Sequence, residues 1–170
     1  MRTLKLILAA TLWAAAAAAA NPGTLGLGLG VTFFTPPEAD GDVTALYSAR
    51  GHYWLTRHVV PSLEVGYAHY GAGERTYNYL PVFLRGTYHF GTNKVFDPYA
   101  GMGLIYARKW WNGDATGTSN TGGYSALGGL NFAATANFVI GAGVEYAVPE
   151  ATNFDSGYPA FIINLGAGGF

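Results

Sequence analysis

From Leu25 to Phe33 every second residue is a large apolar one, and the residues between them are glycine or threonine. Successive side chains of an extended chain point to opposite faces, so this segment has one apolar face and one nearly bare face. The alternation continues through about eight segments, and the charges inside them fall in the opposite phase. Barrels with a lipid-facing exterior have this pattern. We expect an all-β chain that forms an eight-stranded antiparallel up-and-down transmembrane β-barrel.

The composition favours membrane exposure through strands. Only 11% of the residues are charged, whereas ordinary soluble domains have about 25%. After residue 20 no apolar run is long enough for a membrane-spanning helix. The chain has no cysteine, which excludes disulfide bonds and thiolate metal sites.

Residues 1–20 have the features of a signal peptide. Arg2 and Lys5 precede an apolar stretch, and small residues lie just before Asn21. A permanent membrane helix is the less favoured interpretation, because the stretch is short and alanine-rich. Residues 21–170 then form the barrel, with seven basic and ten acidic residues. This net negative charge argues against a nucleic-acid partner.

Turn-forming residues divide the chain into eight predicted strands. Three short turns alternate with four connections that are mostly longer and more polar, an arrangement that separates the periplasmic from the extracellular end of a barrel. The loops include residues 71–75 and the longest one, residues 112–123. The predicted strands are approximately 25–34, 43–55, 60–70, 77–90, 98–110, 124–132, 138–148 and 159–170.

Charged residues of the inward phase predict an interior network. Arg50 pairs with Glu64 if the intervening turn centres near Arg57, and Glu64 lies opposite Arg85 if the next loop centres between residues 74 and 75. Glu145, also inward, brings the charges close to balance. Buried ions must be paired, and eight strands leave room only for side chains. We expect a plugged lumen; a gated or proton-conducting path is the alternative.

Other polar residues are weaker candidates. The inward His52 and His89 are expected to fill the interior rather than to catalyse a reaction. Asp40 and Asp42 are weak calcium candidates in a loop, but the twelve-residue calcium motif is absent and a solvated surface explains them better. We therefore expect no cofactor, no metal and no enzymatic activity.

Aromatic residues cluster toward the strand ends, as in the two girdles of membrane barrels. Inward glycines are expected to make room for bulky partners such as Phe83 and Tyr99. The residues assigned to the girdles are Tyr53, Trp54, Tyr88, Phe90, Phe96, Phe132 and Phe138 at one end, and Phe33, Tyr47, Tyr106, Trp110, Trp111, Tyr124, Tyr146 and Tyr158 at the other.

The runs 98–104 (PYAGMGL) and 141–146 (GAGVEY), together with the terminal Phe170, resemble the small outer-membrane barrel family. The similarity is closest to the transmembrane domain of OmpA-like proteins, and OmpW-like barrels come next. It implies a barrel inserted by the outer-membrane assembly machinery through a last strand that ends in an aromatic residue. It also implies that the four inward charges correspond to the family's internal salt-bridge network.

The last strand departs from the family pattern. Its apolar phase is Phe161, Ile163, Leu165 and Ala167, whereas Phe170 falls in the other phase. Either a bulge near residues 168–169 shifts the register or Phe170 points inward.

The sequence predicts a monomeric integral outer-membrane protein with a structural or surface-interaction role. Its expected partners are outer-membrane lipids, including lipopolysaccharide-type lipids, and the assembly machinery. The alternative is an OmpW-like conduit for small or apolar molecules. Two less favoured alternatives are a lipid-modifying enzyme, which would need a His-x-Ser motif that is absent, and a secreted lipocalin-like barrel with reversed faces.

Overall fold

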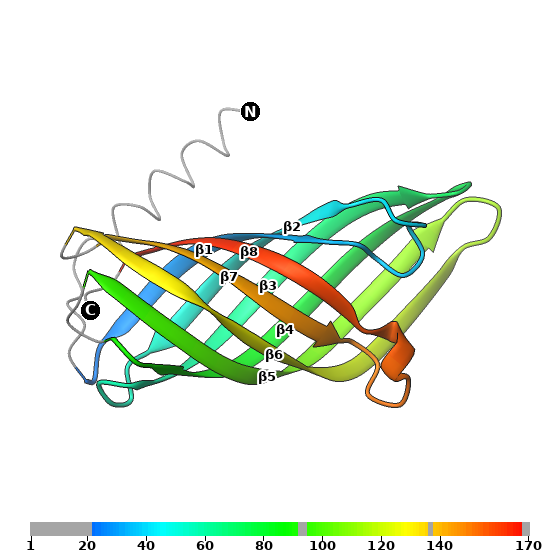
Figure 1. Cartoon of the computed structure of the whole chain (residues 1–170). Coiled ribbons are helices and arrows are strands. Elements are labelled where there is room, and N and C mark those ends of the chain that lie inside the picture. The colour runs from blue at the N-terminus through cyan, green and yellow to red at the C-terminus, as the bar shows by residue number, and fades with distance from the viewer. Residues whose placement is uncertain (1–21, 92–94, 136–137, 168–170) are drawn as a thin grey trace.

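The computed structural model describes residues 22–91, 95–135 and 138–167. Eight antiparallel strands form a closed barrel in which each strand pairs with its neighbours in sequence and β1 pairs with β8 (Figure 1). This confirms the predicted fold class. The strands are β1 (Leu25–Phe34), β2 (Thr44–Tyr53), β3 (Val59–Ala72), β4 (Arg75–His89), β5 (Phe96–Asn112), β6 (Gly117–Thr135), β7 (Phe138–Val148) and β8 (Tyr158–Ala167), with a short 3-10 helix, η2 (Phe154–Ser156), before β8.

In the described ranges, no helix combines the length and the hydropathy needed to cross a bilayer. The predicted signal peptide, residues 1–20, and the terminal Phe170 lie outside the described residues.

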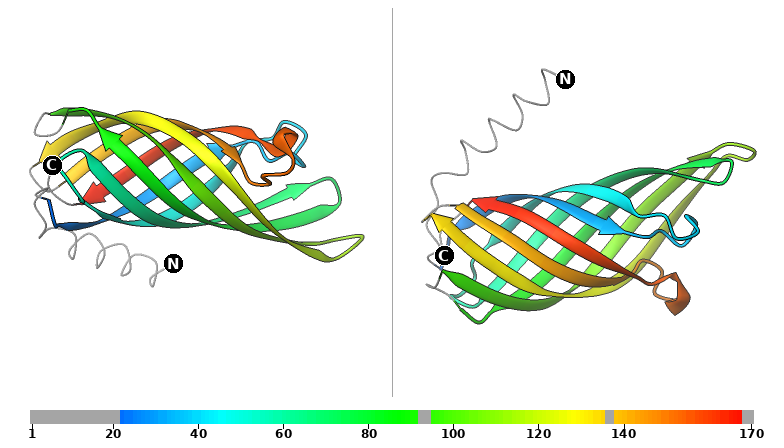
Figure 2. Two further views of the ribbon diagram at one scale, coloured as in Figure 1. Left: turned by 90° about the horizontal axis from the view of Figure 1, so that it is seen from below. Right: turned by 45° about the horizontal axis from the view of Figure 1, so that its top comes forward.

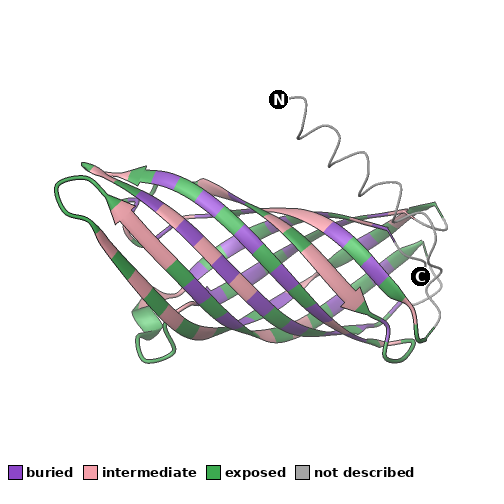
Figure 3. Ribbon diagram, turned by 180° about the vertical axis from the view of Figure 1, so that it is seen from behind, coloured by how far each residue is buried: buried purple, intermediate pink, exposed green. Residues whose placement is uncertain are grey.

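Buried and exposed residues alternate along the strands, as the bands of colour in Figure 3 show. In β1 the side chain of Leu25 is 70% exposed, whereas Gly26 and Gly28 are buried. Met102, Leu104, Val144 and Ile163 are likewise exposed on other strands. An apolar exterior of this extent marks a surface that contacts lipid or another partner rather than water.

The barrel has two distinct ends. At the turn end, short segments join β2 to β3, β4 to β5 and β6 to β7. At the loop end, the β3–β4 and β5–β6 hairpins reach farther than the loops that follow β1 and β7 (Figure 2).

The predicted loops 71–75 and 112–123 are wrong in extent. β3 and β4 are separated by only two residues, and β6 already begins at Gly117. Polar residues of these segments lie in paired strands; Thr118, for example, lies opposite Trp110 of β5. Strands that extend beyond the bilayer need no apolar face, so their composition resembles that of a loop.

Glycines create space for large interior side chains, as predicted for Tyr99. A Cβ atom at Gly129 or at Gly143 would lie 2.7 Å from the Tyr99 hydroxyl oxygen. The Phe83 ring, the other predicted partner, lies under the Arg85 guanidinium group, whose Cζ is 4.0 Å from the ring centroid.

Two predicted girdle residues, Trp54 and Tyr158, are buried instead, with exposures of 4% and 6%. Trp54 follows the phase of His52, and Tyr158 follows that of Ala160 and Ile162, so both point inward. The prediction that both residues belong to the girdles is therefore wrong. It used their position near a strand end, whereas their phase along the strand indicates that they point inward. Exposed aromatic residues remain at both ends, including Tyr88, Phe90, Phe96 and Phe132 near the turns and Tyr47, Tyr106, Tyr124 and Tyr146 toward the loops.

Candidate functional site

A buried ion cluster lies across the middle of the barrel. The Arg85 guanidinium contacts Glu64 through Nη1 and Glu145 through Nη2, with 2.7 Å between Nη2 and the Glu145 Oε2. All three side chains are at most 6% exposed. Arg85 is on β4 and Glu145 on β7, which are not neighbours, so the contact spans the lumen. We call Glu64, Arg85 and Glu145 the central ion cluster.

The register explains how this cluster differs from the predicted row. Arg50 lies opposite Glu64, as predicted. Arg85 lies opposite Ser62 rather than Glu64, because the β3–β4 turn centres one residue earlier than expected. The shift replaces Glu64 by Ser62 as the residue opposite Arg85. Both residues are on the inward face of β3, so Arg85 still reaches Glu64 diagonally.

Arg50 is not part of the central ion cluster. Within the described part of the chain, no carboxylate lies within 4.0 Å of its guanidinium group. The order predicted from the sequence was cation–anion–cation across neighbouring strands. The structure instead has anion–cation–anion, because Arg85 extends across the lumen to Glu145. This corrects the position of Arg50, which lines a cavity on the turn side of the cluster.

This turn-end cavity has a volume of about 50 Å³ and is lined by Arg50, His52, His89 and Asn164 among others. His52 lies against Gly26, where a Cβ atom would overlap the imidazole ring. The Asn164 side chain is buried beside Gly141, where a Cβ atom would lie 2.6 Å from its Nδ2. The volume and polar lining suit a few water molecules.

His89 belongs to a buried hydrogen-bond chain at the turn end. Its Nδ1 lies 2.5 Å from Asp97, and its Nε2 lies 3.1 Å from the Thr87 hydroxyl. Asp97 also accepts a hydrogen bond from the Gly91 amide. The order of hydroxyl, imidazole and carboxylate resembles that of a nucleophilic triad, but the Thr87 hydroxyl already donates to the Val60 carbonyl. We interpret the chain as interior packing.

Sequence reasoning missed Asp97. The residue shares the inward phase of Tyr99, so extending the alternation of the fifth strand by two positions toward its start would have found it.

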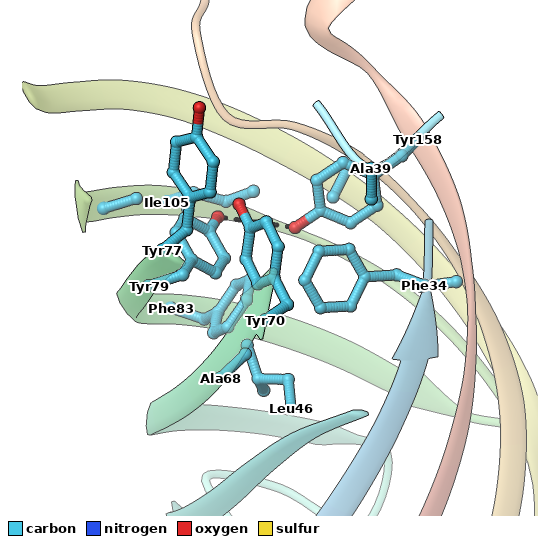
Figure 4. Packing of buried hydrophobic residues seen from close by; sticks show 13 residues of the cluster. Phe34, Ala39, Leu46, Ala68, Tyr70, Tyr77, Tyr79, Phe83, Ile105 and Tyr158 are labelled. Carbon is cyan, nitrogen blue, oxygen red and sulfur yellow. Dashed lines mark hydrogen bonds between the residues drawn. The ribbon is translucent and has the colours of Figure 1, made fainter. Parts of the chain in front are cut away.

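On the loop side of the central ion cluster, aromatic rings pack together inside the barrel (Figure 4). The Phe34 ring lies 4.7 Å from that of Tyr158 and 6.0 Å from that of Tyr79, centroid to centroid. The hydroxyl oxygens of Tyr79 and Tyr158 are 3.4 Å apart. These contacts join β1, β4 and β8 across the barrel. We call Phe34, Tyr70, Tyr79 and Tyr158 the aromatic layer.

Above this layer the barrel opens into a cavity of about 230 Å³, the outer cup. Its floor is the aromatic layer, and its walls come from β5, β6 and the loops that follow β1 and β7. Lys109 and Glu38 form an ion pair in the wall, and the Tyr70 hydroxyl donates to Glu38 over 3.3 Å. The alternation of the fifth strand indicates that Lys109 points inward, whereas nothing in the sequence indicates that its partner is Glu38 in the loop.

Asp40 and Asp42, the weak calcium candidates, lie in the loop between β1 and β2 and are exposed. Among the residues that the structure describes, no three His, Cys, Asp or Glu side chains converge in a way that could hold a metal ion. The expectation that the protein needs no metal or cofactor stays a prediction.

Comparisons with known proteins agree with this fold. The sequence model of a family described as outer membrane protein beta-barrel domain matches residues 5–169. Among solved structures, the N-terminal β-barrel domain of Pseudomonas aeruginosa OprF is 22% identical, with a TM-score of 0.66, and the match covers 85% of this chain and 98% of that one.

Two further solved structures are similar. Neisserial surface protein A is 15% identical with a TM-score of 0.64, covering 84% of this chain and 93% of that one. The outer membrane protein OprG from Pseudomonas aeruginosa is 15% identical with a TM-score of 0.61, covering 88% and 97%. At these identities the likeness shows a shared fold. A search of curated protein sequences found no match.

Proposed function

This chain belongs to the outer membrane protein β-barrel family, and from that premise we propose that it is a closed, non-conducting barrel that presents its loop end to partners outside the cell. It is an integral outer-membrane protein, and its apolar exterior faces lipid. The proposal concerns what the interior and the loop end do.

The central ion cluster is the observation that carries this proposal. Arg85 links β4 to β7 through Glu145 and is bonded to Glu64 on β3, so its side chain crosses the lumen. Removing one partner of a buried ion pair leaves an uncompensated charge, which costs about 3–5 kcal/mol. Opening a path through the cluster requires breaking such contacts, and the closed arrangement is therefore favoured.

The aromatic layer supports closure of the lumen at a second position, on the loop side of the central ion cluster. Tyr79, Tyr158 and Phe34 are all buried, and they contact one another from three different strands. A solute that enters from the loop end meets this apolar packing before it reaches the central ion cluster. Eight-stranded barrels have an interior that side chains fill, and both layers agree with that rule.

The extended hairpins support a surface-interaction role. The Arg75 side chain at the start of β4 donates to Asp114 in the β5–β6 connection, with 2.7 Å between Nε and Oδ1. The β4–β5 pairing, which continues to Thr76 and Asn112, makes the two hairpins one four-stranded surface beyond the other loops (Figure 2), and this ion pair adds a contact at their tips. Such a surface, held above the lipid by a filled barrel, suits contact with a partner.

For partners, we propose outer-membrane lipids of the lipopolysaccharide type, with the chain acting as a monomer inserted by the assembly machinery. Arg108 is exposed on the outside of β5, just beyond the exposed Tyr106 toward the loop end, where a cation can pair with lipid phosphates. A related fold, Ail of Yersinia pestis, has been solved with the anionic heparin analogue sucrose octasulfate. We propose that the protein has no catalytic activity.

A liposome-swelling assay distinguishes the closed barrel from a conduit for small or apolar molecules. Vesicles containing the refolded protein are diluted into isotonic solutions of a small sugar or a small amphiphilic alcohol. We expect swelling rates equal to those of protein-free vesicles, with a general porin as the positive control. Faster swelling in the sugar would favour a pore, and accelerated entry of the alcohol alone would favour the conduit; either result contradicts the closed barrel.

A further inference from the structure

The outer cup combines an aromatic floor with unpaired acidic groups. Phe34, Tyr70, Tyr79 and Tyr158 form the floor, and Glu150 and Asp155 lie in the wall formed by the loop between β7 and β8. Both carboxylates are exposed, and neither forms an ion pair with any residue that the structure describes. Glu38, the third acid of the lining, is neutralised by Lys109.

The charge of the whole loop end favours a cation. Seven acids and three bases lie there, which gives a net charge of −4. A concave site lined by one sign of charge attracts the opposite ion and concentrates it. The acids are Glu38, Asp40, Asp42, Glu74, Asp114, Glu150 and Asp155, and the bases are Arg75, Arg108 and Lys109.

The geometry favours an organic cation over a metal ion. No three potential metal ligands converge in the described part of the chain, and a cavity of about 230 Å³ is far larger than a bare ion requires. Aromatic faces attract ammonium groups when these lie within about 6 Å of the ring centroid. The tyrosine hydroxyls add hydrogen-bond acceptors, and the Phe34 ring and two prolines, Pro36 and Pro37, offer apolar contact for a methylene chain.

We propose that the outer cup binds an aliphatic polyamine. The two ammonium groups pair with Glu150 and Asp155 at the wall, and the methylene chain packs against the aromatic floor. A diamine satisfies the two free carboxylates and the apolar surface together, which neither a metal ion nor a neutral alcohol does. The proposal rests on the proposed function in one respect, because the aromatic layer that closes the lumen is also the floor of the cup.

Calorimetric titration of the refolded protein in detergent micelles with 1,4-diaminobutane tests this proposal. The matched probe is 1,4-butanediol, which has the same chain and no charge. We expect saturable binding of the diamine that weakens as salt is raised, and no binding of the diol. Equal binding of the two compounds, or no saturable binding of the diamine, would overturn the proposal.

Two double variants distinguish diamine binding in the outer cup from attraction by the overall negative charge of the loop end. The double variant Glu150→Gln with Asp155→Asn removes both free carboxylates of the cup and should weaken diamine binding about tenfold or more. The control, Asp42→Asn with Glu74→Gln, removes the same charge from loop residues that do not line the cavity and should weaken it far less. Equal losses would mean that only the overall charge attracts the diamine, and would reject the site.

Conductance of the same preparations distinguishes the two proposals. If the diamine fails to bind and the barrel does not conduct, the cup proposal is wrong while the closed barrel stands. If the diamine binds and the barrel conducts, the cup proposal stands and the closed barrel is wrong.

Discussion

Arg85 is the residue on which the proposed closed interior depends most, because its single guanidinium group contacts two buried carboxylates. The Arg85 and Glu145 side chains are each only 2% exposed, so water cannot replace either contact. Polar groups buried without partners carry a desolvation penalty, and the central ion cluster avoids it only while all three members are present.

Arg85→Met tests the importance of this cluster for stability. The change leaves Glu64 and Glu145 buried without their cation and should lower the free energy of unfolding by about 3–5 kcal/mol. Urea unfolding of the protein in lipid vesicles, followed by tryptophan fluorescence, measures the loss. The control is Arg75→Met, which breaks the exposed pair with Asp114 and should leave the unfolding midpoint nearly unchanged. Equal midpoints for the two variants would contradict the role assigned to Arg85.

At this scale, the sequence predicts the face of a residue better than its partner. The phase of each strand correctly directed Glu64, Arg85 and Glu145 inward, because alternation depends only on local backbone geometry. The contact between Arg85 and Glu145 depends on side-chain reach across the lumen. The partner of Lys109, Glu38, lies in a loop with no periodicity. Neither contact follows from strand phase.

At the scale of elements, the two long hairpins form one unit because β4 and β5 pair as far as Thr76 and Asn112. The ion pair between Arg75 and Asp114 extends this connection to the hairpin tips. The Arg75 Nε and Nη2 atoms donate to the two Asp114 carboxylate oxygens over 2.7 and 3.1 Å. The bidentate geometry is the stronger form of such a pair. Its exposure means that it orders the hairpin tips rather than stabilising the barrel.

The pH dependence of Asp114 tests this connection. Hydrogen bonds from Arg75 hold the pKa of the Asp114 carboxyl below its ordinary value of 3.8. A lowered pKa in the folded state means that the link is fully present above pH 3.8 and is lost as the pH falls through the folded pKa. Carboxyl carbon NMR should give a midpoint below 3.8, and Arg75→Met should raise it toward that value. A midpoint at or above 3.8 in the unchanged protein would show that the tips are not connected in this way.

The elements also show where sequence reasoning loses accuracy. The number and order of the strands were predictable, because apolar alternation is strong within the lipid-facing band. The ends of β3 to β6 were not, since strands in water on both faces carry the Thr, Ser, Asn and Gly residues of a loop. The turn at residues 73–74 lies one residue earlier than expected, so Arg85 pairs with Ser62 and not with Glu64. A predicted loop of five residues, 71–75, does not define the turn centre closely enough to give this register.

At the scale of the whole molecule, interior side chains pack in successive layers between the two ends of the barrel. The chain from Thr87 through His89 to Asp97 packs the turn end, the central ion cluster crosses the middle, and the aromatic layer fills the loop side. The outer cup lies above them. Under the proposal, this order makes the loop end a binding surface supported by packed side chains and closes the barrel axis.

Single-channel recording in planar bilayers tests the closed barrel most directly. The unchanged protein, inserted at a density verified by an independent assay, should give no steady conductance steps across the voltage range that the bilayer tolerates. Arg85→Ala, which removes the ion pairs with Glu64 and Glu145, should give more frequent openings if it inserts. Steady, well-defined channels from the unchanged protein would contradict the account.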